Sequence, residues 1–99
     1  MFGLNQKEML EKMQQSLVDS KAKLAKIRVF GEAGGGLVKI ELDGNRKLTS
    51  LEITADLKLI EKEELEDFLA IALEKALDKA EEINQTEVSS SALQFLPGF

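Results

Sequence analysis

A glycine-rich stretch, GEAGGGLV at residues 31–38, is the first place in this chain where chemistry could occur. Closely spaced glycines are typical of loops that cradle phosphate groups, because the backbone must come close to the ligand. Such a loop has the pattern G-x-x-x-x-G-K-[ST] and leads into a helix. Gly31 and Gly36 have the required spacing, but Leu37 stands where Lys is needed, and the residues that follow alternate like a strand.

A dinucleotide-binding loop is not matched either. Its pattern, G-x-G-x-x-G, needs a glycine at the position of Ala33. Strand-like residues lie on both sides of the three glycines. We therefore interpret the stretch as a strand–turn–strand connection whose glycines adopt positive φ angles, with or without a β-bulge.

Acidic residues form a second candidate site, since a group of carboxylates can bind Mg²⁺ or Ca²⁺. No D-x-[DN]-x-[DN]-G loop organises them. Their position at the predicted start of a helix, where negative charge is favourable, indicates a solvated helix N-terminus instead. The candidate ligands are Glu63, Glu64, Glu66 and Asp67, and Glu61 stands next to them at the start of the predicted helix.

The chain contains no His and no Cys. These absences exclude the usual zinc ligand sets, the Ser–His–Asp triad, the Cys–His pair and disulfide bonds. Glycoside hydrolysis needs two carboxylates across a cleft, and a small sheet with two helices leaves little room for one. We therefore expect no enzymatic activity, no cofactor, no metal site and no small-molecule substrate.

Basic residues gather at the start of the chain. Residues 1–28 hold six of the 13 Lys and Arg residues but only three of the 18 Asp and Glu residues, although the net charge is −5. At ~100° per residue, Lys12, Lys23 and Lys26 fall within one arc of a helix, and Lys21 flanks the other side. The arc is either an ordinary solvated face or a surface that contacts phosphates along a duplex. The sequence has no helix-turn-helix, zinc finger or RNA-binding aromatic motif that would read bases.

A long helix must carry these bases. Asn5 and Glu8 have the spacing of a capping box. Apolar residues then recur at alternating spacings of three and four, from Leu10 to Ile27, without an intervening Gly or Pro. This pattern predicts a helix over about residues 5–26 with a narrow apolar seam, made of Leu10, Met13, Leu17, Ser20, Leu24 and Ile27.

Three strand-like runs follow, at residues 27–33, 37–42 and 47–54. Apolar and polar residues alternate in them, and the DGNR sequence at 43–46 is typical of a tight turn. The runs predict an antiparallel meander.

A second helix is predicted over about residues 61–86, with a broad apolar face opposite an acidic face. Ile71 interrupts the acidic face, either as a single exposed residue or as a contact with a second subunit.

The predicted lengths suggest how these elements assemble. A helix of this size is ~33–39 Å long, whereas a six-residue strand spans only ~20 Å. The helices must therefore project beyond the sheet. A sheet of three strands also leaves apolar stripes half covered, which favours a homodimer.

Four segments of the chain, taken in their order and spacing, resemble the YbaB/EbfC family of bacterial nucleoid-associated proteins. Together they extend over most of the sequence, although no single segment is decisive. The segments are MLEKMQQSL (9–17), GEAGGGLVKIELDGNRKLTSLEI (31–53), LEDFLAIALEKALDKAEE (65–82) and FLPGF (95–99).

The resemblance implies an α+β protein of element order α-β-β-β-α, with a three-stranded antiparallel meander. Two long helices would protrude like the arms of tweezers from a homodimer. The resemblance also implies low-selectivity binding of double-stranded DNA, effects on nucleoid organisation and gene expression, and no catalysis. The alternative is a dimeric adaptor that binds other proteins through its acidic helix and apolar tail.

The family often carries Asn where this chain has Glu74, which adds negative charge. We therefore expect DNA binding to be weak and salt-dependent, because Lys and Arg contacts with phosphates must supply it. The predicted contacts lie on the first helix, at the start of the first strand and in the hairpin: Lys12, Lys21, Lys23, Lys26, Arg28, Arg46 and Lys47.

The same reasoning predicts one domain, residues 1–88, followed by a tail, residues 89–99, that is either flexible or docked on the domain. The N-terminus lacks a signal pattern, and no apolar run approaches the ~18–20 residues needed to span a bilayer. We expect a protein of the cytoplasm and nucleoid with no membrane partner.

Overall fold

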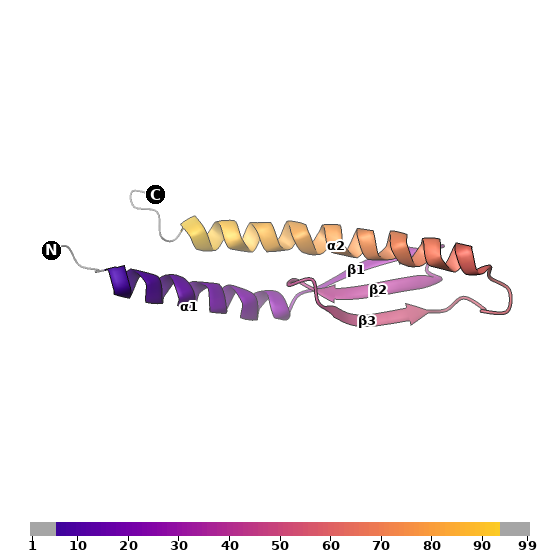
Figure 1. Cartoon of the computed structure of the whole chain (residues 1–99), viewed down its shortest axis with the longest axis horizontal. Helices are drawn as coiled ribbons and strands as arrows, with labels where there is room; N and C mark the ends of the chain where they lie inside the picture. The colour runs from indigo at the N-terminus through magenta and orange to yellow at the C-terminus, as the bar shows by residue number, and fades with distance from the viewer. Residues whose placement is uncertain (1–5, 94–99) are drawn as a thin grey trace.

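The computed structural model describes residues 6–93, except the side chains of residue 88 and residues 90–93 (Figure 1). In chain order the elements are α1 (Gln6–Ala25), β1 (Arg28–Ala33), β2 (Val38–Asp43), β3 (Leu48–Ile53) and α2 (Lys62–Leu93). The strands pair antiparallel in the order β1-β2-β3. This arrangement confirms the predicted α-β-β-β-α fold and its three-stranded meander.

Helix α1 agrees with the predicted helix to within one residue at each end. Asn5, the predicted cap, lies outside the described residues. Of the residues in α1, Ser20 and Leu24 are buried. The other described seam residues of α1, Leu10, Met13 and Leu17, are exposed.

Helix α2 is longer than the sequence predicts. The expected end at about residue 86 is wrong, because the helix continues to Leu93. The serine-rich residues 87–93 contain no Gly or Pro, and tertiary contacts override their modest helix propensity. One such contact joins the Oγ of Ser20 on α1 to the Glu87 carboxylate, at 3.2 Å. The predicted tail boundary at residue 88 thus falls inside α2, while residues 94–99 lie outside the described part.

The glycine-rich stretch forms the turn between β1 and β2, as predicted. Gly34, Gly35 and Gly36 have φ angles of 66°, 68° and 93°. These values lie in the left-handed region that side chains disfavour. The turn joins two paired strands, with Ala33 opposite Val38.

The core lies where α2 crosses β1 and β2. A stripe of small residues on α2, Ala72, Ala76 and Ala80, is fully buried against the sheet. Gly31 of β1 permits this close packing, since a Cβ there would collide with the carbonyl oxygen of Ala72. The strand residues of the core are Val29, Ala33, Val38, Ile40 and Leu42.

The two edges of the sheet differ. Along β1, the ammonium groups of Lys75 and Lys79 on α2 donate hydrogen bonds to the carbonyl oxygens of Glu32 (3.2 Å) and Phe30 (2.9 Å). Along β3, all six residues are exposed, including Leu48 at 61% and Leu51 at 49%. Helix α2 therefore covers β1 and β2 and leaves β3 uncovered.

The molecule is elongated, with extents of 71 × 20 × 17 Å. Helix α1 and the second half of α2 run side by side beyond the sheet (Figure 1), as the predicted lengths require. In the described residues 6–93, neither helix is apolar enough over a sufficient length to cross a membrane.

Candidate nucleic-acid interface

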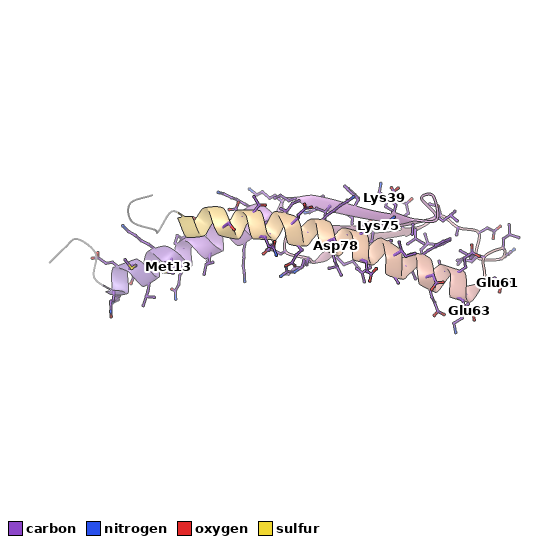
Figure 2. The ribbon with its side chains drawn as sticks, turned by 90° about the horizontal axis from the view of Figure 1, so that it is seen from above. Met13, Lys39, Glu61, Glu63, Lys75 and Asp78 are labelled. Atoms are coloured by element: carbon purple, nitrogen blue, oxygen red, sulfur yellow. The ribbon has the colours of Figure 1, made fainter. Side chains whose placement is uncertain are left out.

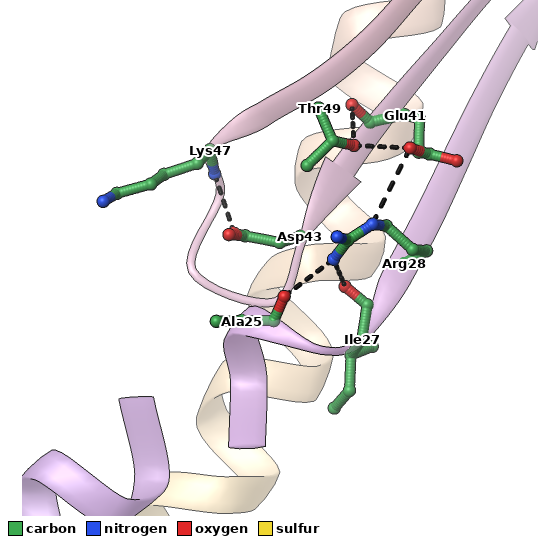
Figure 3. Close-up of polar contacts among 7 residues, drawn as sticks. All are labelled: Ala25, Ile27, Arg28, Glu41, Asp43, Lys47 and Thr49. Carbon is green, nitrogen blue, oxygen red and sulfur yellow. Dashed lines mark hydrogen bonds and ion pairs between the residues drawn. The ribbon is translucent and has the colours of Figure 1, made fainter. Parts of the chain in front are cut away.

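The hairpin between β2 and β3 is organised by Asp43, a buried residue with 6% exposure. One oxygen of its carboxylate, Oδ1, accepts hydrogen bonds from the backbone N–H groups of Asn45 (2.8 Å) and Lys47 (3.0 Å). Figure 3 shows the bond to Lys47. Arg46, between them, has a positive φ of 67°. The predicted DGNR turn is confirmed, and it presents the Arg46 and Lys47 side chains at the surface.

Three hydrogen bonds to backbone carbonyl oxygens hold the hairpin against the end of α1 and against α2. The backbone N–H of Gly44 donates to the carbonyl oxygen of Leu24 at 2.9 Å. The Asn45 side-chain amide donates to the carbonyl oxygen of Lys21 at 3.0 Å. From α2, the Asn84 amide donates to the carbonyl oxygen of Gly44 at 3.3 Å. Three elements distant in sequence are thereby held together.

This junction contains a groove of about 650 Å³. Three of the seven predicted DNA contacts line it, namely Lys21 from α1 and Arg46 and Lys47 from the hairpin. All three are exposed. The groove thus gathers three cations that are up to 26 positions apart in the sequence, and we call it the basic groove.

Two of the predicted contacts are paired with carboxylates of α2. Arg46 Nη1 lies 2.8 Å from Oε2 of Glu81, and Lys23 Nζ lies 3.7 Å from Oε1 of Glu87. The four side chains are between 24% and 68% exposed, so each pair contributes little to stability. Their main effect is to offset positive charge beside the basic groove.

Arg28 has a structural role. Its Nη1 donates to the carbonyl oxygens of Ala25 (2.7 Å) and Ile27 (3.1 Å), at the C-terminal end of α1 (Figure 3). Its Nε lies 3.7 Å from a Glu41 oxygen. A cation is favourable at a helix C-terminus. The guanidinium is therefore engaged with its own chain.

The two remaining predicted contacts, Lys12 and Lys26, are exposed and do not line the groove. Lys12 lies nine residues before Lys21, which is about 14 Å along a helix. Within residues 6–93, no ion pair involves any of four of the predicted lysine contacts, namely Lys12, Lys21, Lys26 and Lys47.

Sequence reasoning missed the residues that shape the groove. Asn45 and Asn84 anchor the hairpin, and Glu81 and Glu87 pair with its neighbouring cations. The DGNR pattern marks Asn45 only as a turn residue, and the long-range contacts of all four residues act across at least 24 positions of sequence.

The acidic cluster at the start of α2 is exposed and lies at the opposite end of the molecule from the N-terminus of α1, as the labels of Glu61, Glu63 and Met13 show (Figure 2). Among the described residues, no three acidic side chains gather closely enough to hold a metal ion.

Known proteins resemble this chain in sequence and in fold. The model of the YbaB/EbfC DNA-binding family matches residues 1–95. A nucleoid-associated protein of Hahella chejuensis is 41% identical over 80 residues, covering 81% of this chain and 74% of that protein. One of Flavobacterium johnsoniae is 35% identical over 88 residues, covering 89% and 82%. The crystal structure of an uncharacterized protein from Helicobacter pylori has a TM-score of 0.67 at 26% identity, covering 82% of this chain and 94% of that one.

Proposed function

Because the chain belongs to the YbaB/EbfC DNA-binding family, we propose that it is a nucleoid-associated protein that binds double-stranded DNA. Its binding has low sequence selectivity and affects nucleoid organisation and gene expression. The protein acts at the nucleoid, in the cytoplasm, and has no catalytic role.

The observation that carries the DNA contact is the convergence of Lys21, Arg46 and Lys47 on one groove. Lysine and arginine contacts with phosphate oxygens fix a protein on a duplex without reading its sequence. Lys23 and Lys26 are also exposed near the C-terminal end of α1, but neither lines the groove. Lys12 and Arg28 are secondary contacts, since Lys12 lies apart and Arg28 is engaged with its own backbone.

The acidic residues of the chain limit the affinity. The net charge is −5, and Glu81 and Glu87 lie beside two of the cations. Each phosphate contact changes the slope of log K against log salt by about −0.9. With three groove cations per chain, binding is weak at physiological salt and stronger at low salt.

The protein acts as a homodimer, and an apolar groove supports this proposal. The groove, of about 340 Å³, lies between α2 and the uncovered face of β3. Leu48, Leu51 and Leu73 line it and are 61%, 49% and 40% exposed. A second copy placed on this face would bury these residues and duplicate the basic groove.

The alternative function is a dimeric protein–protein adaptor. It is favoured by the exposed carboxylates of α2 that lie outside the ion pairs with Lys23 and Arg46, such as Glu74, Asp78 and Glu82. An adaptor would use this acidic face instead of the basic groove.

The test is a titration of the purified protein against a generic duplex at low and moderate salt, followed by fluorescence anisotropy. We expect binding at low salt that weakens as salt is added, with similar affinity for unrelated duplexes. Absence of binding at low salt would contradict the DNA proposal and leave the adaptor function.

A further inference from the structure

Arg46 is shared by the basic groove and by the apolar groove beside β3. On the basic groove it stands with Lys21 and Lys47. On the apolar groove it stands with Leu48 and Leu51. Among the described residues, Arg46 alone lines both grooves. A change of this one side chain therefore alters two surfaces at once.

The backbone of Arg46 has a conformation that arginine does not favour. Its φ of 67° lies in the left-handed region, which Gly, Asn and Asp adopt more easily. Within residues 6–93, no other residue besides glycine has a positive φ. The turn would form more easily with Gly or Asn at this position. Backbone strain that persists in this way points to a use for the side chain.

Contacts at both ends of Arg46 fix the path of its side chain. Its backbone N–H donates a hydrogen bond to the carbonyl oxygen of Asp43 at 3.0 Å. Its Nη1 donates to Oε2 of Glu81 on α2 at 2.8 Å. The side chain is 43% exposed. A long arginine side chain can lay its methylene groups on an apolar surface while its guanidinium meets an anion.

We propose that Arg46 belongs to both interfaces of the protein, an inference that rests on the proposed DNA binding and homodimer. Its guanidinium contacts a phosphate at the basic groove, and its methylene groups pack against the second copy at the rim of the apolar groove. The neighbouring Lys47 lines only the basic groove and serves DNA alone. Two adjacent cations of one hairpin thus have different roles.

The experiment compares three single variants of the full-length protein. Arg46→Asn removes the guanidinium and most of the methylene groups, and asparagine tolerates the positive φ. Arg46→Lys keeps a cation on a long aliphatic stem. Lys47→Asn is the matched control at the next position. Sedimentation without DNA gives the dimer dissociation constant of each variant. Fluorescence anisotropy with a generic duplex at low salt gives the DNA affinity, at protein concentrations where each variant is dimeric. Circular dichroism checks folding.

We expect Arg46→Asn to raise the dimer dissociation constant at least about fivefold, because truncated arginines are often costly in protein interfaces. The same variant should bind DNA at least about threefold more weakly, since one phosphate contact is lost. Lys47→Asn should lose DNA affinity to a similar degree and keep the wild-type dimer. Arg46→Lys should keep the dimer and most of the DNA affinity.

Three results would overturn the dual role of Arg46. The first is an Arg46→Asn variant that dimerises, or binds DNA, as tightly as the wild type. The second is an equal loss of the dimer in Lys47→Asn, and the third is loss of the dimer in Arg46→Lys. A wild-type protein that stays monomeric or binds no DNA would instead refute the proposed function, and this inference with it.

Discussion

Nη1 of Arg46 lies 2.8 Å from Oε2 of Glu81, so α2 supplies a carboxylate to the cation at the tip of the hairpin. Both side chains are roughly half exposed. A phosphate group that approaches the basic groove must therefore compete with a carboxylate of the protein itself. We expect this opposing charge to weaken DNA contact at the groove without blocking it.

The first prediction follows from this competition. Replacing Glu81 by Gln should tighten DNA binding up to about fivefold, since an exposed ion pair contributes ~0.2–1 kcal/mol. Fluorescence anisotropy at low salt measures the change. The matched control is Glu82→Gln, which removes the same charge from the neighbouring position. Equal effects of the two variants would indicate that only net charge matters.

The second prediction concerns the lysines of the groove. The Lys21→Glu, Lys47→Glu double variant should bind DNA at least about tenfold more weakly. The slope of log K against log salt concentration should become less negative by about two. The control, Lys58→Glu with Lys62→Glu, makes the same charge change outside the groove. Equal loss in both variants would contradict a localised interface.

The third prediction concerns Gly31. Substitution by Ala should destabilise the fold by about 1–3 kcal/mol or more, because the new methyl group overlaps the backbone of α2. Gly35→Ala is the comparison, since its Cβ meets open space and only the positive φ is unfavourable, at about 1–2 kcal/mol. Urea denaturation measures both. A smaller loss for Gly31→Ala than for Gly35→Ala would show that β1 can move away from α2.

The fourth prediction addresses the homodimer. Sedimentation of the wild-type protein at micromolar concentration should give a dimer, and Leu51→Glu should give a monomer, because the charge enters the apolar groove beside β3. Leu59→Glu, at a loop position that is 84% exposed, should stay dimeric. A monomeric wild-type protein would refute the dimer, and a dimeric Leu51→Glu variant would place its interface elsewhere.

The sequence was sufficient for the features that depend on neighbouring residues. Period-two alternation and the DGNR turn located the strands, and three adjacent glycines located the turn after β1. The end of α2 was misplaced because the signal lies in α1, where Ser20 holds Glu87, and not in the serine-rich segment itself.

The candidate site was only partly predictable for the same reason. The basic residues could be named from charge alone, but their grouping could not. Lys21 and Lys47 line the same groove because the Asn45 side-chain amide of the hairpin donates a hydrogen bond to the carbonyl oxygen of Lys21. Charge alone also could not show that the Arg28 guanidinium donates hydrogen bonds to the end of α1, which makes it a secondary contact in the proposed interface. Such contacts depend on how distant segments pack.

The lysine ammonium groups along β1 have a consequence for assembly. Lys75 and Lys79 occupy two carbonyl oxygens that another strand would need, so the sheet can grow only from the β3 side. A sheet with one blocked edge can pair through its strands with at most one further sheet, so it cannot extend into a fibre in this way. Two long side chains of α2 therefore protect one edge of the sheet from pairing with another strand.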